Sequence, residues 1–215
     1  MTSRPTFSRG VRWIGLALAF ALWYLTFVVR PAGFWPMMAG NILLLASLAW
    51  LGGRPLWRKA EWTRDNVVLG VAGAGVLYGV FWIGNQTLIL LARGIPWLAH
   101  RPENLAAIYA GRSELAPQWI ALLLLLLIGP GEEIFWRGFF QRDWAKEIGP
   151  FRGMLLSTLC YVLVHVPTGN PVLILAAAVC GVFWGGLFYW RRSLVPGLVS
   201  HALWDPLIFV LFPIH

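Results

Sequence analysis

Residues 118–140 read QWIALLLLLLIGPGEEIFWRGFF. A helix of this length can span a hydrocarbon layer about 30 Å thick, because it rises about 1.5 Å per residue. The stretch nevertheless carries two adjacent carboxylates, Glu132 and Glu133, and the guanidinium of Arg137. A charge at the centre of a membrane costs about 2.5–3.5 kcal/mol on insertion scales. These residues therefore indicate a buried polar site within a membrane-spanning helix.

The composition of the 215 residues is that of an integral membrane protein, and it excludes a soluble globular enzyme. Hydrophobic residues make up 59% of the chain and charged residues 12%, whereas soluble domains carry about 25% charged residues. The formal net charge is +8, but the basic residues lie scattered at the ends of apolar runs and form no clustered patch. We therefore expect membrane lipid around the chain and no nucleic-acid partner. Cys160 and Cys180 lie inside apolar runs, so we expect two small buried residues and no disulfide framework.

Seven apolar stretches are candidate membrane spans. They are Val11–Val29, Gly33–Leu51, Asn66–Ala92, Gln118–Phe140, Arg152–Val166, Pro171–Trp190 and Leu194–Phe212. The fifth is short, so its helix either begins earlier, in Asp143–Gly149, or lies buried among the others. The expected fold is all-α, a single polytopic membrane helix bundle of about seven to eight transmembrane helices. Residues 1–117 would supply N-terminal transmembrane helices and a linker, and residues 118–215 a catalytic core.

The distribution of basic residues favours a cytoplasmic N-terminus, because cytoplasmic loops carry an excess of Lys and Arg. In that orientation the cytoplasmic segments hold Arg4, Arg9, Arg54, Arg58, Lys59, Arg64, Arg142, Lys146, Arg152, Arg191 and Arg192. The outer segments hold Arg30, Arg93, Arg101 and Arg112. The longest outer segment, 93–117, contains Trp97, Pro102 and Tyr109, and it forms either an interfacial cap or a plain tether. The expected location is a cell membrane, that of a prokaryote.

The polar cluster of the fourth span has two distinct parts. Pro130 lacks a backbone donor and stands between two glycines, which predicts a helix break beside a cavity. Glu133 and Arg137 are four residues apart, so they share a helix face and can pair. Glu132 is rotated about 100° from Glu133 and has no local counter-ion, so it is free to act as a base. The alternative is a structural Glu–Arg lock between two helices.

Two later spans each carry a pair of polar residues at the same i, i+4 spacing. Tyr161 and His165 share one face, and so do His201 and Asp205, where the carboxylate can orient the imidazole. Each pair is either part of a site or a buried hydrogen-bonded pair. Counted along the helices, Glu132, His165 and His201 all lie within about one turn of mid-membrane. Three helices can therefore face one polar pocket.

Such a pocket suits amide hydrolysis. A buried carboxylate can take a proton from water while an imidazole stabilises the developing oxyanion. The zinc-protease His-Glu-x-x-His helix and the Gly-x-Ser-x-Gly elbow are both absent from the sequence. Ser157 and Ser200 are expected to be helix-packing residues rather than nucleophiles.

Taken in order, Glu132-Glu133-x-x-x-Arg137, aromatic-x-x-x-His165 and His201-x-x-x-Asp205 resemble the motifs of the CPBP family. This family includes CAAX prenyl endopeptidases and bacteriocin-processing proteins, and the resemblance covers roughly residues 118–212. It implies an intramembrane endopeptidase with a cavity open to the cytoplasm, acting on a peptide or membrane-protein substrate. It also implies that Glu132 activates water, that Glu133 and Arg137 support it, and that His165 and His201, joined by Asp205, position water or stabilise the oxyanion.

Two positions depart from the family pattern. Tyr161 stands where Phe is frequent, and Asp205 where Asn is frequent. Asn can donate a hydrogen bond to an oxyanion, whereas an ionised Asp cannot. The family has been described both as metalloproteases and as metal-independent glutamic proteases. A divalent metal such as zinc, held by Glu132, His165 and His201, therefore stays open at this point.

Two other functions compete with proteolysis. The first is a non-catalytic immunity or scaffold protein that binds a partner in the membrane. The second is a proton-coupled carrier that uses the Glu and His residues as a relay, which would favour inverted repeats and broken helices in both halves. The sequence shows one Gly-Pro-Gly stretch, and the first three spans carry no ionisable residue in their interior. The carrier therefore ranks last.

Overall fold

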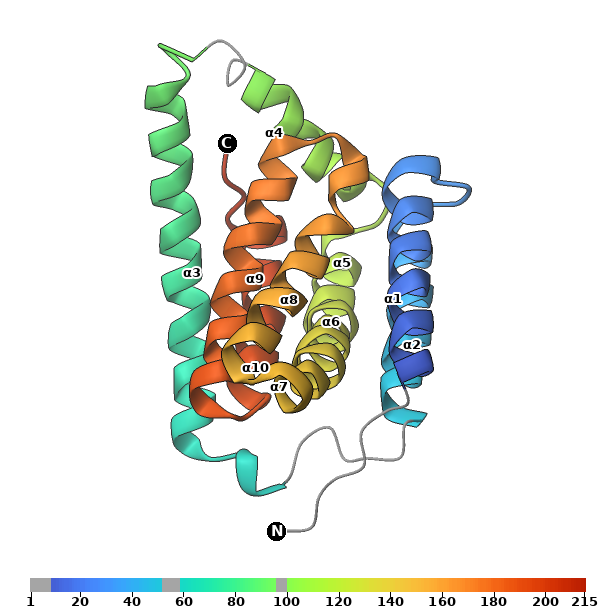
Figure 1. Ribbon diagram of the computed structural model, residues 1–215. Helices are drawn as coiled ribbons and strands as arrows, with labels where there is room; N and C mark the ends of the chain where they lie inside the picture. Colours follow the sequence, from blue (N-terminus) through green and yellow to red (C-terminus); the bar gives the residue numbers. More distant parts are fainter. Residues whose placement is uncertain (1–8, 52–58, 96–99) are drawn as a thin grey trace.

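The computed structural model describes residues 9–51, 59–95 and 100–215 (Figure 1). All regular structure among these residues is helical. Five helical stretches are long and apolar enough to cross a membrane: Gly10–Val29, Arg64–Leu91, Pro117–Ile148, Pro150–Thr168 and Pro171–Arg191. Two shorter apolar helices are Phe34–Trp50 and Val195–Leu211. These seven lie at the positions of the seven predicted candidates, so the all-α fold is confirmed in the described part of the chain, with five of the seven helices long enough to cross a membrane.

The first two helices form a pair along one side of the bundle, and the third helix stands on the opposite side (Figure 1). They are α1 (Arg9–Tyr24), extended by a π-helical turn at Leu25–Val29, α2 (Phe34–Leu51) and α3 (Arg64–Leu91). The Asn41 amide on α2 donates to Thr26 Oγ1 and to the Leu22 carbonyl, which joins the pair. At the lower end an ion pair of 2.6 Å joins Arg12 of α1 to Glu147.

The predicted break at Gly-Pro-Gly is wrong, because Pro117–Ile148 is one continuous helical stretch of 32 residues. It consists of α5 (Pro117–Leu123), α6 (Gly129–Glu133) and α7 (Arg142–Ile148), joined by π-helical turns at Leu124–Ile128 and Ile134–Gln141. The first π-helical turn ends just before Pro130, so the missing donor of the proline falls at the start of a new α-helical segment. A π-helical turn is wider than an α-helical turn, so it accommodates the ring of Pro130 more easily.

Gly129 does not break the helix but allows α6 and α10 to pack closely. A Cβ on Gly129 would lie 3.1 Å from the main-chain carbonyl carbon of His201. The main chains of α6 and α10 therefore approach closely where both carry polar residues.

Of the two alternatives for the short fifth span, the start within Asp143–Gly149 is not the one observed. Residues 142–148 belong to α7, and α8 (Pro150–Leu163) starts after Gly149. Gly149 has a φ of +93°, a conformation that favours glycine. Pro150 then starts the new helix with a φ that suits a first turn. Helices α9 (Pro171–Arg191) and α10 (Val195–Pro206) follow, and α10 continues into a π-helical turn at Leu207–Leu211.

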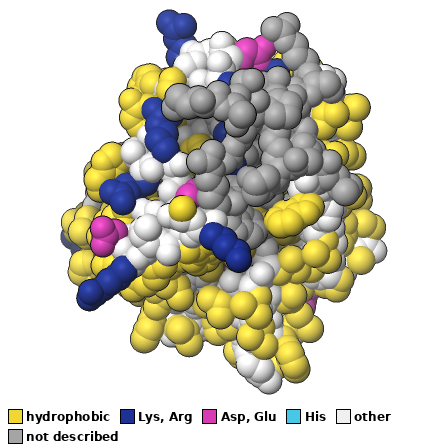
Figure 2. All heavy atoms as spheres, turned by 90° about the horizontal axis from the view of Figure 1, so that it is seen from below, with side chains coloured by type: hydrophobic (Ala, Val, Ile, Leu, Met, Phe, Trp, Pro, Cys, Tyr) yellow, Lys and Arg dark blue, Asp and Glu magenta, His cyan; other side chains and the backbone are white. Residues whose placement is uncertain are grey.

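The two ends of the bundle differ in charge. The lower end, where α1 begins, carries basic side chains that gather on one face (Figure 2). The described basic residues at this end are Arg12, Lys59, Arg64, Arg142, Lys146, Arg152, Arg191 and Arg192. Arg4, Arg54 and Arg58, which belong to the same prediction, lie outside the described residues, and so does the Arg9 side chain. The upper end holds Arg30, Arg93, Arg101 and Arg112.

A short helix, α4 (Arg101–Tyr109), lies across the upper end of the bundle (Figure 1). Its Tyr109 hydroxyl donates to the Ile208 carbonyl at 3.1 Å. Of the two expectations for residues 93–117, the structure therefore supports a cap, although Trp97 lies outside the described residues.

The crossing of α3 and α10 depends on Gly70, where a Cβ would lie 2.6 Å from the Cβ of Val199. We expect Gly70→Ala to lower the free energy of unfolding by about 1–3 kcal/mol, because the helices must move apart. Gly75 on the same helix faces open space, so Gly75→Ala should leave stability unchanged or raise it by up to about 1 kcal/mol. Thermal unfolding of the detergent-purified proteins measures both changes. Equal melting temperatures for the two variants would contradict this account of the packing.

Candidate active site

A cavity of about 660 Å³ occupies the upper half of the bundle, between α3, α4, α8, α9 and α10. Most of its lining is apolar, with Phe27, Trp35 and Phe81 among the aromatic members. Its polar lining residues from the predicted motifs are Glu132, Tyr161, His165, His201 and Asp205. The structure therefore brings residues of all three motifs to one pocket, on α6, α8 and α10.

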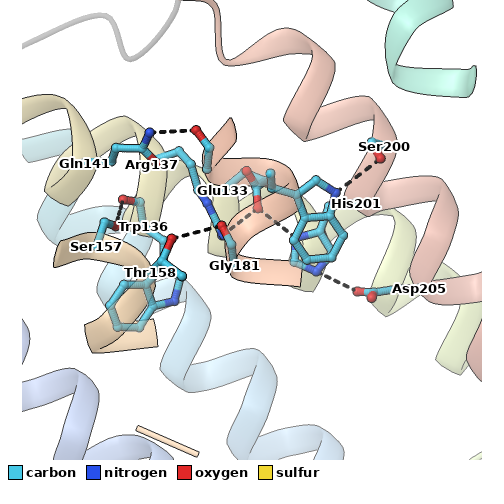
Figure 3. A network of polar contacts seen from close by, with 12 residues as sticks. Glu133, Trp136, Arg137, Gln141, Ser157, Thr158, Gly181, Ser200, His201 and Asp205 are labelled. Atoms are coloured by element: carbon cyan, nitrogen blue, oxygen red, sulfur yellow. Dashed lines mark hydrogen bonds and ion pairs between the residues drawn. The ribbon is translucent and has the colours of Figure 1, made fainter. Parts of the chain in front are cut away.

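Glu133 lies at the centre of a polar network that joins three helices (Figure 3). Its Oε1 atom accepts hydrogen bonds from Arg137 Nη1 at 2.9 Å and from His201 Nδ1 at 3.0 Å. Arg137 also donates to the Gly181 carbonyl of α9 at 3.3 Å. Glu133 and Arg137 are both fully buried, so the predicted pair is confirmed as a buried lock. The second oxygen of Glu133, Oε2, has no hydrogen-bond partner among the residues that the structure describes.

His201 is held on both sides by carboxylates. Its Nδ1 faces Glu133, and its Nε2 lies 3.4 Å from Asp205 Oδ2. When both carboxylates are ionised they only accept hydrogen bonds, so both ring nitrogens donate and the ring carries a positive charge. The predicted orientation of His201 by Asp205 matches this contact.

The face of the His201 ring is covered by an indole. Trp184 stacks on it with ring centroids 3.6 Å apart and an interplanar angle of 16°, a geometry that favours a cationic ring. The Trp184 indole N–H donates to Ser200 Oγ at 3.2 Å, and Ser157 donates to the Trp136 carbonyl. Both serines are therefore packing residues, as expected. Cys160 and Cys180 are buried free thiols, also as expected.

Glu132 differs from its neighbour in its surroundings. It is 5% exposed and lines the cavity beside Tyr161, but its Oε2 atom has no hydrogen-bond partner among the residues that the structure describes. A buried acceptor without a partner costs about 1–3 kcal/mol. Adjacent positions on a helix point about 100° apart, which explains how Glu133 faces the helix interfaces while Glu132 faces the cavity.

His165 closes the cavity wall with both ring nitrogens engaged. Its Nδ1 lies 2.7 Å from the Tyr161 carbonyl, and its Nε2 faces the indole N–H of Trp23 at 3.3 Å. A carbonyl only accepts and an indole only donates, so these contacts select the neutral ring with its proton on Nδ1. Sequence reasoning missed Trp23, because the first span carries no motif and its contact with His165 crosses 142 positions of the chain.

The residues considered for a metal do not fit one. Among the described residues, no three His, Cys, Asp or Glu side chains are arranged to hold a metal ion. The nitrogens of His201 face two carboxylates, and those of His165 face Tyr161 and Trp23. Neither imidazole has a free lone pair directed toward Glu132, so the zinc hypothesis on these three residues lacks support.

The comparison with protein families covers this part of the chain. Residues 114–207 match the family model of the type II CAAX prenyl endopeptidase Rce1-like proteins. This segment is a domain of the Rce1-like type II CAAX prenyl endopeptidase (CPBP) family, as the resemblance implied. Members of the family are membrane endopeptidases. No curated protein and no solved structure matched the chain.

The position of the cavity bears on two of the expectations. Its lining reaches from Glu132 to Arg30, α4 and Asn170, all toward the upper end of the bundle (Figure 1). The first helix begins at the opposite, lower end, where the basic residues gather. With a cytoplasmic N-terminus, this part of the cavity lining would therefore lie toward the outer side.

The buried lock predicts a large effect on stability. We expect Arg137→Met to lower the free energy of unfolding by about 3–5 kcal/mol, because Glu133 keeps its charge and loses its main partner. Arg152 lies exposed at the start of α8, so the matched Arg152→Met change should stay within about 0.5 kcal/mol. Thermal unfolding in detergent compares the two variants. A melting temperature of Arg137→Met equal to that of the wild type would contradict the role assigned to the lock.

Proposed function

We propose that this protein is an intramembrane endopeptidase in which Glu132 activates the attacking water. The observation that carries the proposal is a buried carboxylate that lines a cavity and has an unpartnered oxygen, next in sequence to a carboxylate that lies outside the cavity lining and holds Arg137 and His201 through its Oε1. The family match supports membrane protease activity for residues 114–207. The substrate is a peptide or a membrane-protein segment that reaches the cavity.

The proposed reaction is general-base hydrolysis of an amide. A water beside Glu132 gives its proton to the carboxylate while its oxygen attacks the carbonyl carbon. Because both N–H groups of His201 already face Glu133 and Asp205, the ring stabilises the developing oxyanion through its positive charge rather than by donating a hydrogen bond. The C–N bond then breaks, and the protonated Glu132 returns the proton to the leaving amine.

The remaining site residues act by positioning Glu132, His201 or the substrate. Arg137 holds Glu133 in place and thereby fixes the position of His201. His165 contributes as a neutral ring in the wall, so on this proposal it positions substrate or water rather than supplying charge. Residues 118–215 form the catalytic core, and residues 1–117 add Trp23 and the α3 wall.

We also propose an orientation in the membrane. The excess of basic residues at the lower end supports a cytoplasmic N-terminus. In that orientation the cavity opens toward the outer side, beneath α4. A multi-pass protein of a prokaryotic plasma membrane would then act on segments that enter from that side.

The decisive variant is Glu132→Gln, which keeps the shape of the side chain and removes its ability to take a proton. We expect cleavage to fall by at least about 100-fold with no loss of thermal stability. Glu103 lies exposed on α4, so Glu103→Gln serves as the matched control and should cleave like the wild type. The measurement is cleavage of a quenched peptide library by detergent-purified protein. Equal rates for Glu132→Gln and the wild type would refute the role of Glu132.

The engaged histidine nitrogens predict that hydrolysis does not depend on a metal held by Glu132, His165 and His201. Strong chelators should therefore leave the rate of peptide cleavage unchanged. If chelation abolished cleavage and added zinc restored it, a metal mechanism would replace the one proposed here.

A further inference from the structure

The segment Phe212–His215 leaves the end of α10 and runs without helical structure toward α4, between α3 and α9 (Figure 1). Ile214 is 7% exposed and lines the same cavity as Glu132, whereas the side chain of Phe212 is 59% exposed. A stretch of the chain's own extended backbone therefore borders the cavity, with one apolar side chain buried in its wall.

Three polar side chains hold the main chain of this segment. Tyr78 Oη donates to the Phe212 carbonyl at 3.1 Å, and Asn85 Nδ2 donates to the His215 carbonyl at 3.0 Å. Tyr109 Oη accepts from the Ile214 N–H at 3.2 Å. Tyr78 and Asn85 come from α3 and Tyr109 from α4.

These contacts resemble those by which a protein binds the main chain of a peptide. An extended main chain in apolar surroundings must find partners for its N–H and C=O groups, since each unpaired group carries a desolvation penalty. The contacts go to main-chain atoms, so they recognise an extended peptide whatever its side chains. Burial raises the pKa of Tyr109, which keeps its hydroxyl protonated. That hydroxyl donates to Ile208 while it accepts from Ile214.

We propose that Tyr78, Asn85 and Tyr109 form a binding site for the main chain of an extended apolar peptide, and that Phe212–His215 occupies this site until a substrate displaces it. The cavity continues from Ile214 to Glu132, so a peptide bound here is continuous with the reactive carboxylate. The identification of that peptide as a substrate rests on the proposed function, whereas the binding site itself does not.

The first test uses the full chain and a fluorescent peptide of sequence Leu-Phe-Pro-Ile-His, copied from residues 211–215. Ile214→Asp should release the segment, because a carboxylate is not buried in an apolar wall without a partner. Phe212→Asp is the matched control, since that side chain is already exposed. We expect the peptide to bind Ile214→Asp at least about tenfold more tightly than the wild type or Phe212→Asp, because a tethered occupant competes at high effective concentration.

Equal binding to Ile214→Asp and Phe212→Asp would overturn the proposal, and so would absence of binding to a folded Ile214→Asp protein. Thermal unfolding establishes that each variant is folded before the comparison is made.

The second test addresses the contacts themselves. In the Ile214→Asp protein, we expect Asn85→Leu and Tyr109→Phe each to weaken peptide binding by about three- to tenfold, the loss for one hydrogen bond. Gln86 is the exposed neighbour on α3, so Gln86→Leu should leave binding unchanged. Unchanged affinity in both Asn85→Leu and Tyr109→Phe would overturn the assignment.

Binding and hydrolysis are separated by combining Ile214→Asp with Glu132→Gln. We expect this double variant to keep the peptide affinity of Ile214→Asp, because Glu132 acts on the scissile bond and not on the docked main chain. Retained affinity together with full cleavage would refute the proposed function alone. Loss of peptide binding in the double variant would overturn the proposed main-chain binding site of Tyr78, Asn85 and Tyr109.

Discussion

The architecture of the site depends on one carboxylate oxygen, Glu133 Oε1, which is shared between a guanidinium and an imidazole inside the membrane. The two contacts, to Arg137 and His201, join α6 to α10, and the bond from Arg137 to Gly181 adds α9. Removing one partner would leave a buried charge without compensation, so the three helices can separate only at a large cost in free energy. The lock is thus what fixes the position of His201 at the cavity.

This arrangement also explains how two adjacent glutamates have different surroundings. The second oxygen of Glu133 lies against α10, where a Cβ on Gly197 would be 2.7 Å away. The main chains of α6 and α10 also approach closely at Gly129, where a Cβ would lie 3.1 Å from His201. Glu132, one position earlier, lines the cavity. Packing therefore gives the two carboxylates different neighbours, although one oxygen of each has no hydrogen-bond partner among the described residues.

Much of this could be predicted from local spacing. The pair Glu133–Arg137 follows from positions four apart on a helix, and the seven apolar stretches follow from length and composition. The continuity of the helix through Pro130 could not be predicted, because it depends on a π-helical turn two to six residues earlier, and nothing in the leucine run marks that turn. The choice between the two alternatives for the fifth span could not be made from the sequence, because one glycine with positive φ decides where α8 begins.

The contributions of the first half of the chain were beyond local reasoning. Trp23, Tyr78 and Asn85 stand in apolar spans without any motif, and each acquires its contact from a residue more than 100 positions away. Only the tertiary packing of α1 and α3 against the C-terminal helices brings these groups to the cavity wall.

The π-helical turn at Leu124–Ile128 has a consequence for how the chain tolerates length changes. A π-turn behaves as one residue inserted into an α-helix, which advances everything beyond it by about 100°. Deleting a single leucine there would restore a regular α-helix and rotate the following segment by the same angle. Since neighbouring positions differ by that angle as well, the two glutamates would be moved off the directions they now face. The number of residues in the leucine run therefore sets the directions in which Glu132 and Glu133 point. For these directions, the length of the run matters more than which apolar side chains it contains.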